Sequence, residues 1–98
     1  MPTQDEVLTV LKEVEDPEIG VNVVDLGLVY NVAVNDSSVN VEMTLTAPGC
    51  PMHETIARAA EMAIETLPDV KDAHVQMVWN PPWTPDRLTD EGRRLLGF

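Results

Sequence analysis

Cys50 is the residue whose type and position most directly indicate chemistry. It is the one cysteine of the 98 residues and lies in the rigid run Pro48-Gly49-Cys50-Pro51. Proline suits the first turn of a helix, because its missing N–H has no partner there. Cys50 is thereby predicted at the N-cap, beside unpaired backbone N–H groups and the positive end of the helix dipole. This position lowers the pKa of a thiol and favours the reactive thiolate. The alternative is a small buried apolar side chain, a common role of free cysteine.

Three upstream carboxylates fall in one predicted loop: Asp16, Glu18 and Asp25. Loops on a rigid scaffold often carry functional groups, although solvated surface carboxylates are the simpler interpretation. Beside Cys50 these carboxylates would raise the pKa of the thiol and so oppose the helix dipole. The sequence does not decide which effect is larger.

Other polar and aromatic side chains follow the same part of the chain. Thr44 and Thr46 share the solvent-facing side of a predicted strand, where a hydroxyl would line a pocket or simply satisfy strand preference. His53 has two functional interpretations, a base or a metal ligand. The simpler interpretation is an exposed polar residue in the first turn of the helix. Trp79 and Trp83 flank a proline-rich bend, where they would roof the site, anchor an interface or pack against the fold.

The composition excludes several classes of function. Six Lys and Arg against seventeen Asp and Glu give a net charge of −11, which repels nucleic acid and anionic membrane surfaces. A single cysteine excludes an intramolecular disulfide and a self-contained four-thiolate zinc or iron–sulfur site. The remaining ligands of any metal would come from a second chain, a small thiol or other side chains. The first residues, MPTQDEVLTV, lack the basic start of a secretory signal, so we expect a cytoplasmic protein.

Hydrophobic periodicity predicts a first helix and then a hairpin. Thr3 and Glu6 form a capping-box pattern, and the helical spacing continues to Val14, before Pro17. Two runs then alternate between apolar and polar residues about a turn at 35–38. Their apolar members are expected to face the helices: Leu28, Tyr30, Val32 and Val34, then Val39, Val41, Met43 and Leu45.

The second half of the chain predicts a helix, a strand and a short helix. The apolar stripe of the second helix, which starts at Pro51, is Met52, Ile56, Ala59, Ala60, Ala63 and Leu67. The third strand alternates through Ala73, Val75, Met77 and Trp79, and Thr89 caps the last helix. The whole chain, 1–98, is therefore expected to be one α+β domain, a two-layer sandwich of order α-β-β-α-β-(short α). A right-handed crossover makes the second and third strands parallel and the small sheet mixed.

Four motifs in this order resemble one family: Asp16–Glu18, Asp25–Tyr30, Met43–Pro51 and Val78–Trp83. It is the SufT/PaaD-like family of iron–sulfur cluster assembly domains (metal-sulfur cluster biosynthetic proteins), related to eukaryotic cytosolic targeting factors. The resemblance extends from about Asp5 to the C-terminus. Asn80 stands where an acidic residue is common in the family. PaaD proper has a cysteine-rich C-terminal extension that these residues lack, so the resemblance favours the SufT-like form.

The resemblance implies a fold like the C-terminal domain of NifU scaffold proteins. It also implies that Cys50 is the functional thiol, with these residues around it: Asp16, Glu18, Asp25, Thr44 and Thr46. We expect these residues to converge at the start of the second helix. A further layer of side chains around that pocket would consist of His53, Trp79 and Trp83.

Three hypotheses for the function follow. In the first, the protein matures iron–sulfur proteins and Cys50 is a transient ligand of iron or a cluster, with no cofactor stably bound. Its partners would be scaffold or carrier proteins and client apoproteins, and a homodimer would supply two thiols. In the second, the protein is a metal-free adaptor whose acidic loop contacts those partners. The third, an enzyme with a Cys50–His53 dyad, ranks last because no third orienting group is evident; we expect no enzyme.

Overall fold

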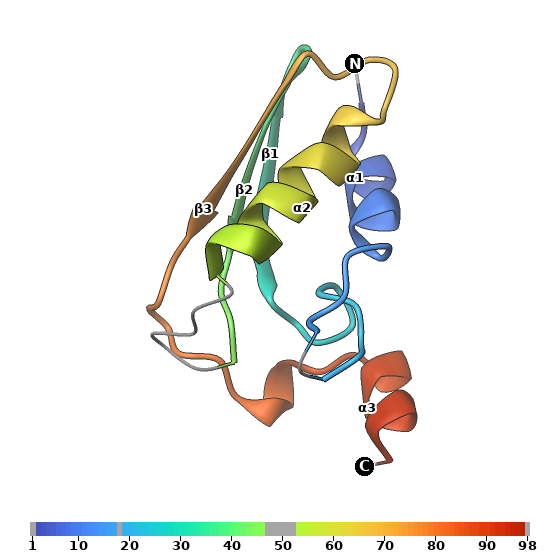
Figure 1. The fold of residues 1–98 in the computed structure, drawn as a ribbon, viewed down its shortest axis with the longest axis vertical. Coiled ribbons are helices and arrows are strands. Elements are labelled where there is room, and N and C mark those ends of the chain that lie inside the picture. Colours follow the sequence, from blue (N-terminus) through green and yellow to red (C-terminus); the bar gives the residue numbers. More distant parts are fainter. Residues whose placement is uncertain (1, 18, 47–52, 98) are drawn as a thin grey trace.

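The computed structural model describes residues 2–17, 19–46 and 53–97. Three strands form one mixed sheet in the order β1-β2-β3, and helices α1 and α2 lie on the same side of it (Figure 1). Helix α3 lies beyond the end of the sheet, far from the N-terminus (Figure 1). The elements are α1 (Gln4–Leu11), β1 (Val29–Asn35), β2 (Ser38–Met43), α2 (His53–Glu65), β3 (Asp72–Met77), the 3-10 helix η1 (Pro85–Arg87) and α3 (Asp90–Leu96). The predicted α+β class and element order are confirmed.

Helix α1 begins as predicted and ends earlier than predicted. The Thr3 hydroxyl accepts from the Glu6 N–H at 3.1 Å, and the Glu6 carboxylate accepts from the Thr3 N–H at 2.9 Å. The helix ends at Leu11, whereas the periodicity predicted it as far as Val14. The Val14 N–H bonds to the Leu11 carbonyl only three residues back, and the Val14 carbonyl accepts from the Val23 N–H at 2.9 Å. Because the Val14 N–H bonds three residues back and not four, the α-helical pattern ends in a tighter turn before the proline is reached.

The hairpin of β1 and β2 has the predicted buried row on β2. Its members are all at most 2% exposed: Val39, Val41, Met43 and Leu45. Asn40, on the other face, is exposed. Asp36 turns the chain with a φ of 52°, a conformation that aspartate tolerates in tight turns. The register predicted from the alternation is therefore confirmed, since a one-residue slip would reverse both faces.

Tyr30 does not follow the predicted alternation of β1. The pairing register shifts between Val29 and Asn31, which marks a β-bulge at this residue. The Tyr30 hydroxyl donates to the Pro81 carbonyl at 2.8 Å, and the Arg87 guanidinium lies 4.4 Å from the centre of its ring. A bulge breaks the two-residue period of a strand. Tyr30 therefore contacts the C-terminal segment, and the expectation that it faces the helices was wrong.

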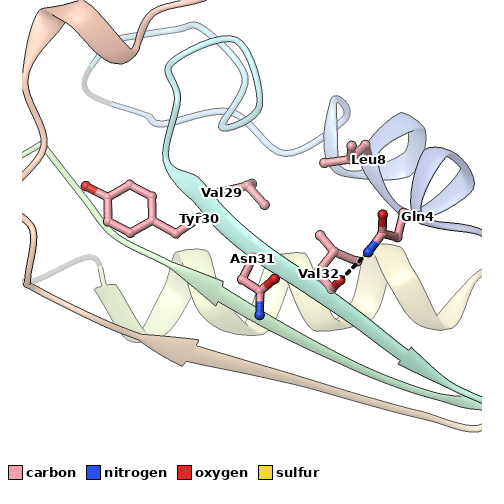
Figure 2. Close-up of a pocket in the computed structure, with 6 residues that line it drawn as sticks. All are labelled: Gln4, Leu8, Val29, Tyr30, Asn31 and Val32. Atoms are coloured by element: carbon pink, nitrogen blue, oxygen red, sulfur yellow. Dashed lines mark hydrogen bonds between the residues drawn. The ribbon is translucent and has the colours of Figure 1, made fainter.

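The outer edge of β1 is partly covered by α1. The Gln4 side-chain amide donates to the Val32 carbonyl at 2.7 Å, and Leu8 lies beside it (Figure 2). A side chain that bonds to an exposed strand carbonyl makes the edge less available to another strand.

Strands β2 and β3 pair in parallel over their full lengths, as predicted. Strand β3 ends at Met77, so Trp79, predicted within the strand's alternating row, lies after it and is 38% exposed. Backbone contacts continue just past the strand ends: the Thr44 N–H bonds to the Leu28 carbonyl and the Val78 N–H to the Met43 carbonyl, both at 2.8 Å.

Helix α2 is described from His53 onward, so its predicted start at Pro51 and the stripe residue Met52 lie outside the described residues. Its buried row is Ile56, Ala60 and Ile64. Ala59, predicted in the stripe, is exposed, and Ile64 was not predicted. The row that faces the sheet repeats every four residues, and Ala59 falls on its flank.

The C-terminal segment, residues 78–97, closes the end of the sheet against the loop that precedes β1. Thr89 caps α3 as predicted, accepting from the Gly92 N–H at 3.0 Å. A Cβ added at Gly92 would clash with the Asp25 carbonyl, and one at Gly27 with the Arg87 carbonyl. Both glycines thus allow close backbone contact, which fixes the loop that carries Asp25.

Candidate functional site

The carboxylate of Asp25 is bound on both oxygens within the fold. Its Oδ2 accepts from the Asn22 side-chain amide at 2.7 Å, and its Oδ1 accepts from the Thr89 hydroxyl at 2.7 Å. The Asp25 N–H donates back to Asn22 Oδ1 at 2.9 Å, and the residue is only 6% exposed. Asp25 therefore joins the loop before β1 to the N-terminus of α3.

These contacts keep Asp25 ionised. Burial raises the pKa of the Asp25 carboxyl, but the hydrogen bonds from Asn22 and Thr89 and the charge of Lys12 lower it. The net pKa lies below the ordinary value of 3.8. The hydrogen-bonded carboxylate is thus favoured over the neutral acid.

Asp16 is also buried, at 5% exposure. Its N–H donates to the Val21 carbonyl at 3.0 Å, and its carbonyl accepts from the Gly20 N–H at 2.7 Å, in a tight turn where Gly20 has a φ of +80°. The interpretation of Asp16 and Asp25 as solvated surface carboxylates is therefore wrong. For the same reason these two side chains offer almost no surface to a partner. Glu18 lies outside the described residues.

The two predicted threonines lie at one small cavity where β2 leaves the sheet. It has a volume of about 90 Å³ and is lined by Thr44, Leu45, Thr46, Trp79, Pro82 and Trp83. Thr44, predicted on the solvent-facing side of the strand, is only 1% exposed. The proline-rich bend folds over this end of the sheet, which explains why the prediction for Thr44 was wrong.

The two tryptophans lie at the cavity in different ways. The Trp83 indole donates to the Leu26 carbonyl at 2.6 Å, so it links the cavity to the loop of Asp25. The Trp79 ring meets the His53 ring edge-on, with centroids 6.4 Å apart and an interplanar angle of 75°. His53 thus packs at the cavity wall, at the start of α2.

The structure therefore brings together part of the predicted site. Thr44, Thr46, Trp79 and Trp83 share the cavity, and His53 contacts one of its walls. Cys50 lies outside the described residues, so the predicted convergence of the carboxylates and Thr46 on its thiol stays a prediction.

Two groups of contacts were not predicted. Asn22 lies three residues before Asp25, a spacing at which asparagine often bonds to a nearby backbone, so a local signal was present. Thr89 was predicted only as a helix cap, and nothing local indicates its bond to a carboxylate 64 residues earlier.

Within residues 2–17, 19–46 and 53–97, no three His, Cys, Asp or Glu side chains are grouped to hold a metal ion. In the same part of the chain, no helix has the length and apolar character needed to cross a membrane.

Comparison with known families agrees with this architecture. Residues 4–77 match the family described as iron–sulfur cluster assembly protein. The chain belongs to this family. The resemblance inferred from the four motifs is thereby confirmed, and the family's name fits a maturation role.

Individual relatives extend the match to nearly the whole chain. The chain is 42% identical to the Fe-S protein maturation auxiliary factor YitW of Bacillus subtilis, over 97% of this chain and 94% of that protein. It is 44% identical to the Fe-S protein maturation auxiliary factor SufT of Staphylococcus aureus, over 84% and 94%. A crystal structure of a domain of unknown function, DUF59, from Bacillus anthracis superposes with a TM-score of 0.90 at 37% identity, covering 97% of this chain and 92% of that one. This family of iron–sulfur cluster assembly proteins thus accounts for both the sequence and the fold.

Proposed function

We propose that this iron–sulfur cluster assembly protein hands iron or a cluster from a scaffold or carrier protein to client apoproteins, with Cys50 as a transient ligand. The observation that carries the proposal is the arrangement of the two described residues that flank the segment 47–52. Thr46 lines the small cavity together with Trp79, and the Trp79 ring contacts His53. The segment that contains Cys50 therefore begins and ends at one packed cluster, which suits a thiol held on a rigid base.

The number of ligands makes such a site transient. A typical cluster is held by four thiolates, and this chain has one cysteine. The others would come from a small thiol, from the donor or client, or from the Cys50 of a second copy. A cluster with shared ligands exchanges readily, as a carrier requires. Asp25 is not a ligand in this proposal, because both its oxygens already accept hydrogen bonds; it holds the loop in place.

Under the same proposal the protein transfers iron or a cluster without catalysing a reaction. It acts in the cytoplasm, where thiols stay reduced. The names of the relatives describe maturation factors, which supports a role without catalysis. The net charge of −11 supports protein partners over nucleic acid and membranes.

Anaerobic reconstitution with iron, sulfide and a small thiol tests the role of Cys50. We expect a labile cluster, seen by visible absorbance and Mössbauer spectroscopy, that is lost in Cys50→Ala and weakened in Cys50→Ser. Thr9→Val, at an exposed residue of α1 outside the cavity, keeps the thiol and its surroundings; it is the matched control and should still bind the cluster. Affinity for iron should rise with pH as the thiol loses its proton. One tightly held metal per chain that survives Cys50→Ala would refute the proposal.

Transfer to a client distinguishes cluster transfer from the adaptor hypothesis. A cluster-loaded donor is mixed with an apoprotein, and recovery of the client's activity is followed with wild type or Cys50→Ala. We expect the variant to lose the acceleration while remaining folded. An equally active Cys50→Ala would establish the metal-free adaptor instead.

A further inference from the structure

An open groove runs between α2 and the turn that follows α1, away from the cavity of the candidate site. Its volume is about 460 Å³, and it is lined by Glu13, Val14, Glu15, Ala59, Met62, Ala63 and Thr66. Met62 is 56% exposed, although it is a large apolar side chain. An exposed apolar side chain in a hollow is a common anchor point for a partner.

One wall of the groove is a second apolar face of α2. The helix packs on the sheet through the row of Ile56, Ala60 and Ile64. Beside that row, a second set of apolar residues recurs at helical spacing and lines the groove: Ala59, Met62 and Ala63. Ala63 packs partly against the core, whereas Ala59 and Met62 are exposed and leave this part of the face open.

The rim of the groove is acidic. Glu13 and Glu15 are both exposed, and none of the described residues that line the groove is a cation. A neighbouring cation on α2 is paired within the helix: the Arg58 guanidinium bonds to Glu61 at 3.3 Å. A second copy of the chain, also with a net charge of −11, would bring like charges together here. The groove is complementary to a basic partner.

We propose that this groove binds an amphipathic, basic segment of a partner protein. An apolar side chain of that segment packs on Met62, and its Lys or Arg residues pair with Glu13 and Glu15. The residues of this surface do not include Cys50. The proposed binding therefore goes beyond the proposed cluster transfer, and each proposal can be refuted without the other.

The test uses three synthetic peptides of equal length that share one amphipathic pattern. The first has leucine at the apolar positions and lysine at the charged positions. The second replaces lysine by glutamate, and the third replaces leucine by serine. Each is titrated into the isotope-labelled protein, and amide chemical shifts are followed by NMR. We expect only the leucine–lysine peptide to give saturable shifts, at residues 13–15 and 59–66. Its affinity should fall as salt is added, because the ion pairs are exposed.

Matched variants separate the groove from the general charge of the protein. Met62→Asp should weaken the leucine–lysine peptide by about tenfold or more, because it places a charge beneath an apolar side chain. Leu95→Asp, at a residue 52% exposed on α3, should leave binding unchanged. The double change E13K/E15K should weaken this peptide by about fivefold or more and favour the leucine–glutamate peptide. The same charge change elsewhere, D72K/D86K, should have a small effect.

Several results would overturn the proposal. These are no saturable shift up to about 1 mM peptide, equal binding of the serine–lysine peptide, shifts outside the groove, and binding that Met62→Asp leaves unchanged. Groove shifts that appear with protein concentration alone would assign the surface to a second copy. Preserved dispersion of the amide spectrum shows that each variant is folded.

Discussion

Replacing Thr89 by Val should weaken the attachment of α3 to the loop of Asp25 and destabilise the fold, although the backbone bond from the residue 89 N–H to the Asp25 carbonyl, at 3.0 Å, is kept. The Thr89 hydroxyl accepts from the Gly92 N–H at 3.0 Å and donates to the Asp25 carboxylate at 2.7 Å. Loss of an N-cap bond costs about 1 kcal/mol. Loss of a hydrogen bond to a charged group costs about 1.5–3 kcal/mol, and Thr89 is exposed, which favours the lower end. We expect the free energy of unfolding to fall by about 2–3 kcal/mol, which lowers Tm by about 10–15 °C in a domain of this size.

The pH dependence of this loss identifies the carboxylate as its source. The pKa of Asp25 is lowered in the folded state from its ordinary value of 3.8, so the unfolded chain binds the proton more readily. The stabilisation is therefore complete above the unfolded pKa and is lost as the pH falls through the folded pKa. The difference between wild type and Thr89→Val should shrink from about 2–3 kcal/mol at pH 7 toward about 1 kcal/mol, the cap alone, near pH 2.

Urea unfolding followed by tryptophan fluorescence measures both quantities. Thr9→Val is the matched control, because the Thr9 hydroxyl donates to an uncharged carbonyl, that of Asp5, at 2.7 Å on the exposed side of α1. It should cost less than about 1 kcal/mol at either pH. A loss in Thr89→Val that equals this control, or that does not change with pH, would refute the reasoning.

Two further changes test how closely the C-terminal segment packs. Gly27→Ala should cost about 3 kcal/mol or more, because Gly27 has a φ of +75° and a Cβ there would clash with the Arg87 carbonyl. Gly20→Ala, at a φ of +80° with open space around it, should cost only about 1 kcal/mol, and equal losses in urea unfolding would contradict the close contact. Trp83→Phe should cost about 1–2 kcal/mol by removing the bond to the Leu26 carbonyl and should speed amide exchange around that residue; an unchanged midpoint would show that the bond contributes nothing.

Local signals in the sequence predicted most of the fold. The capping box at Thr3, the register of the β2 row and the cap of α3 all depend on residues a few positions apart, and all are confirmed. The prediction that failed for Tyr30 involves long-range contacts. Tyr30 leaves the strand's alternation at a bulge and contacts Pro81 and Arg87, which a reading of the strand alone does not reveal.

In the candidate site, too, local sequence signals indicated the residues and long-range contacts were missed. Residue type drew attention to Asp25, but its bond to Thr89 depends on how the C-terminal segment folds onto the loop before β1. Thr44 alternates as a solvent-facing residue should, and only the bend that covers it makes it buried. Side-chain chemistry thus indicated the residues, and tertiary packing determined their surroundings.

The contact between Thr89 and Asp25 also has a consequence for how the protein is made. The two residues are 64 positions apart in the chain. A ribosome adds about 5–20 residues per second, so Asp25 is synthesised about 3–13 s before its partner exists. Until the last helix emerges, the loop before β1 lacks its contacts with the backbone of Arg87 and Thr89, and its carboxylate lacks one of its donors. Completion of this region of the fold must therefore wait until Thr89 has been synthesised and has emerged from the ribosome, and a nascent chain stalled before Thr89 would hold the loop unfinished.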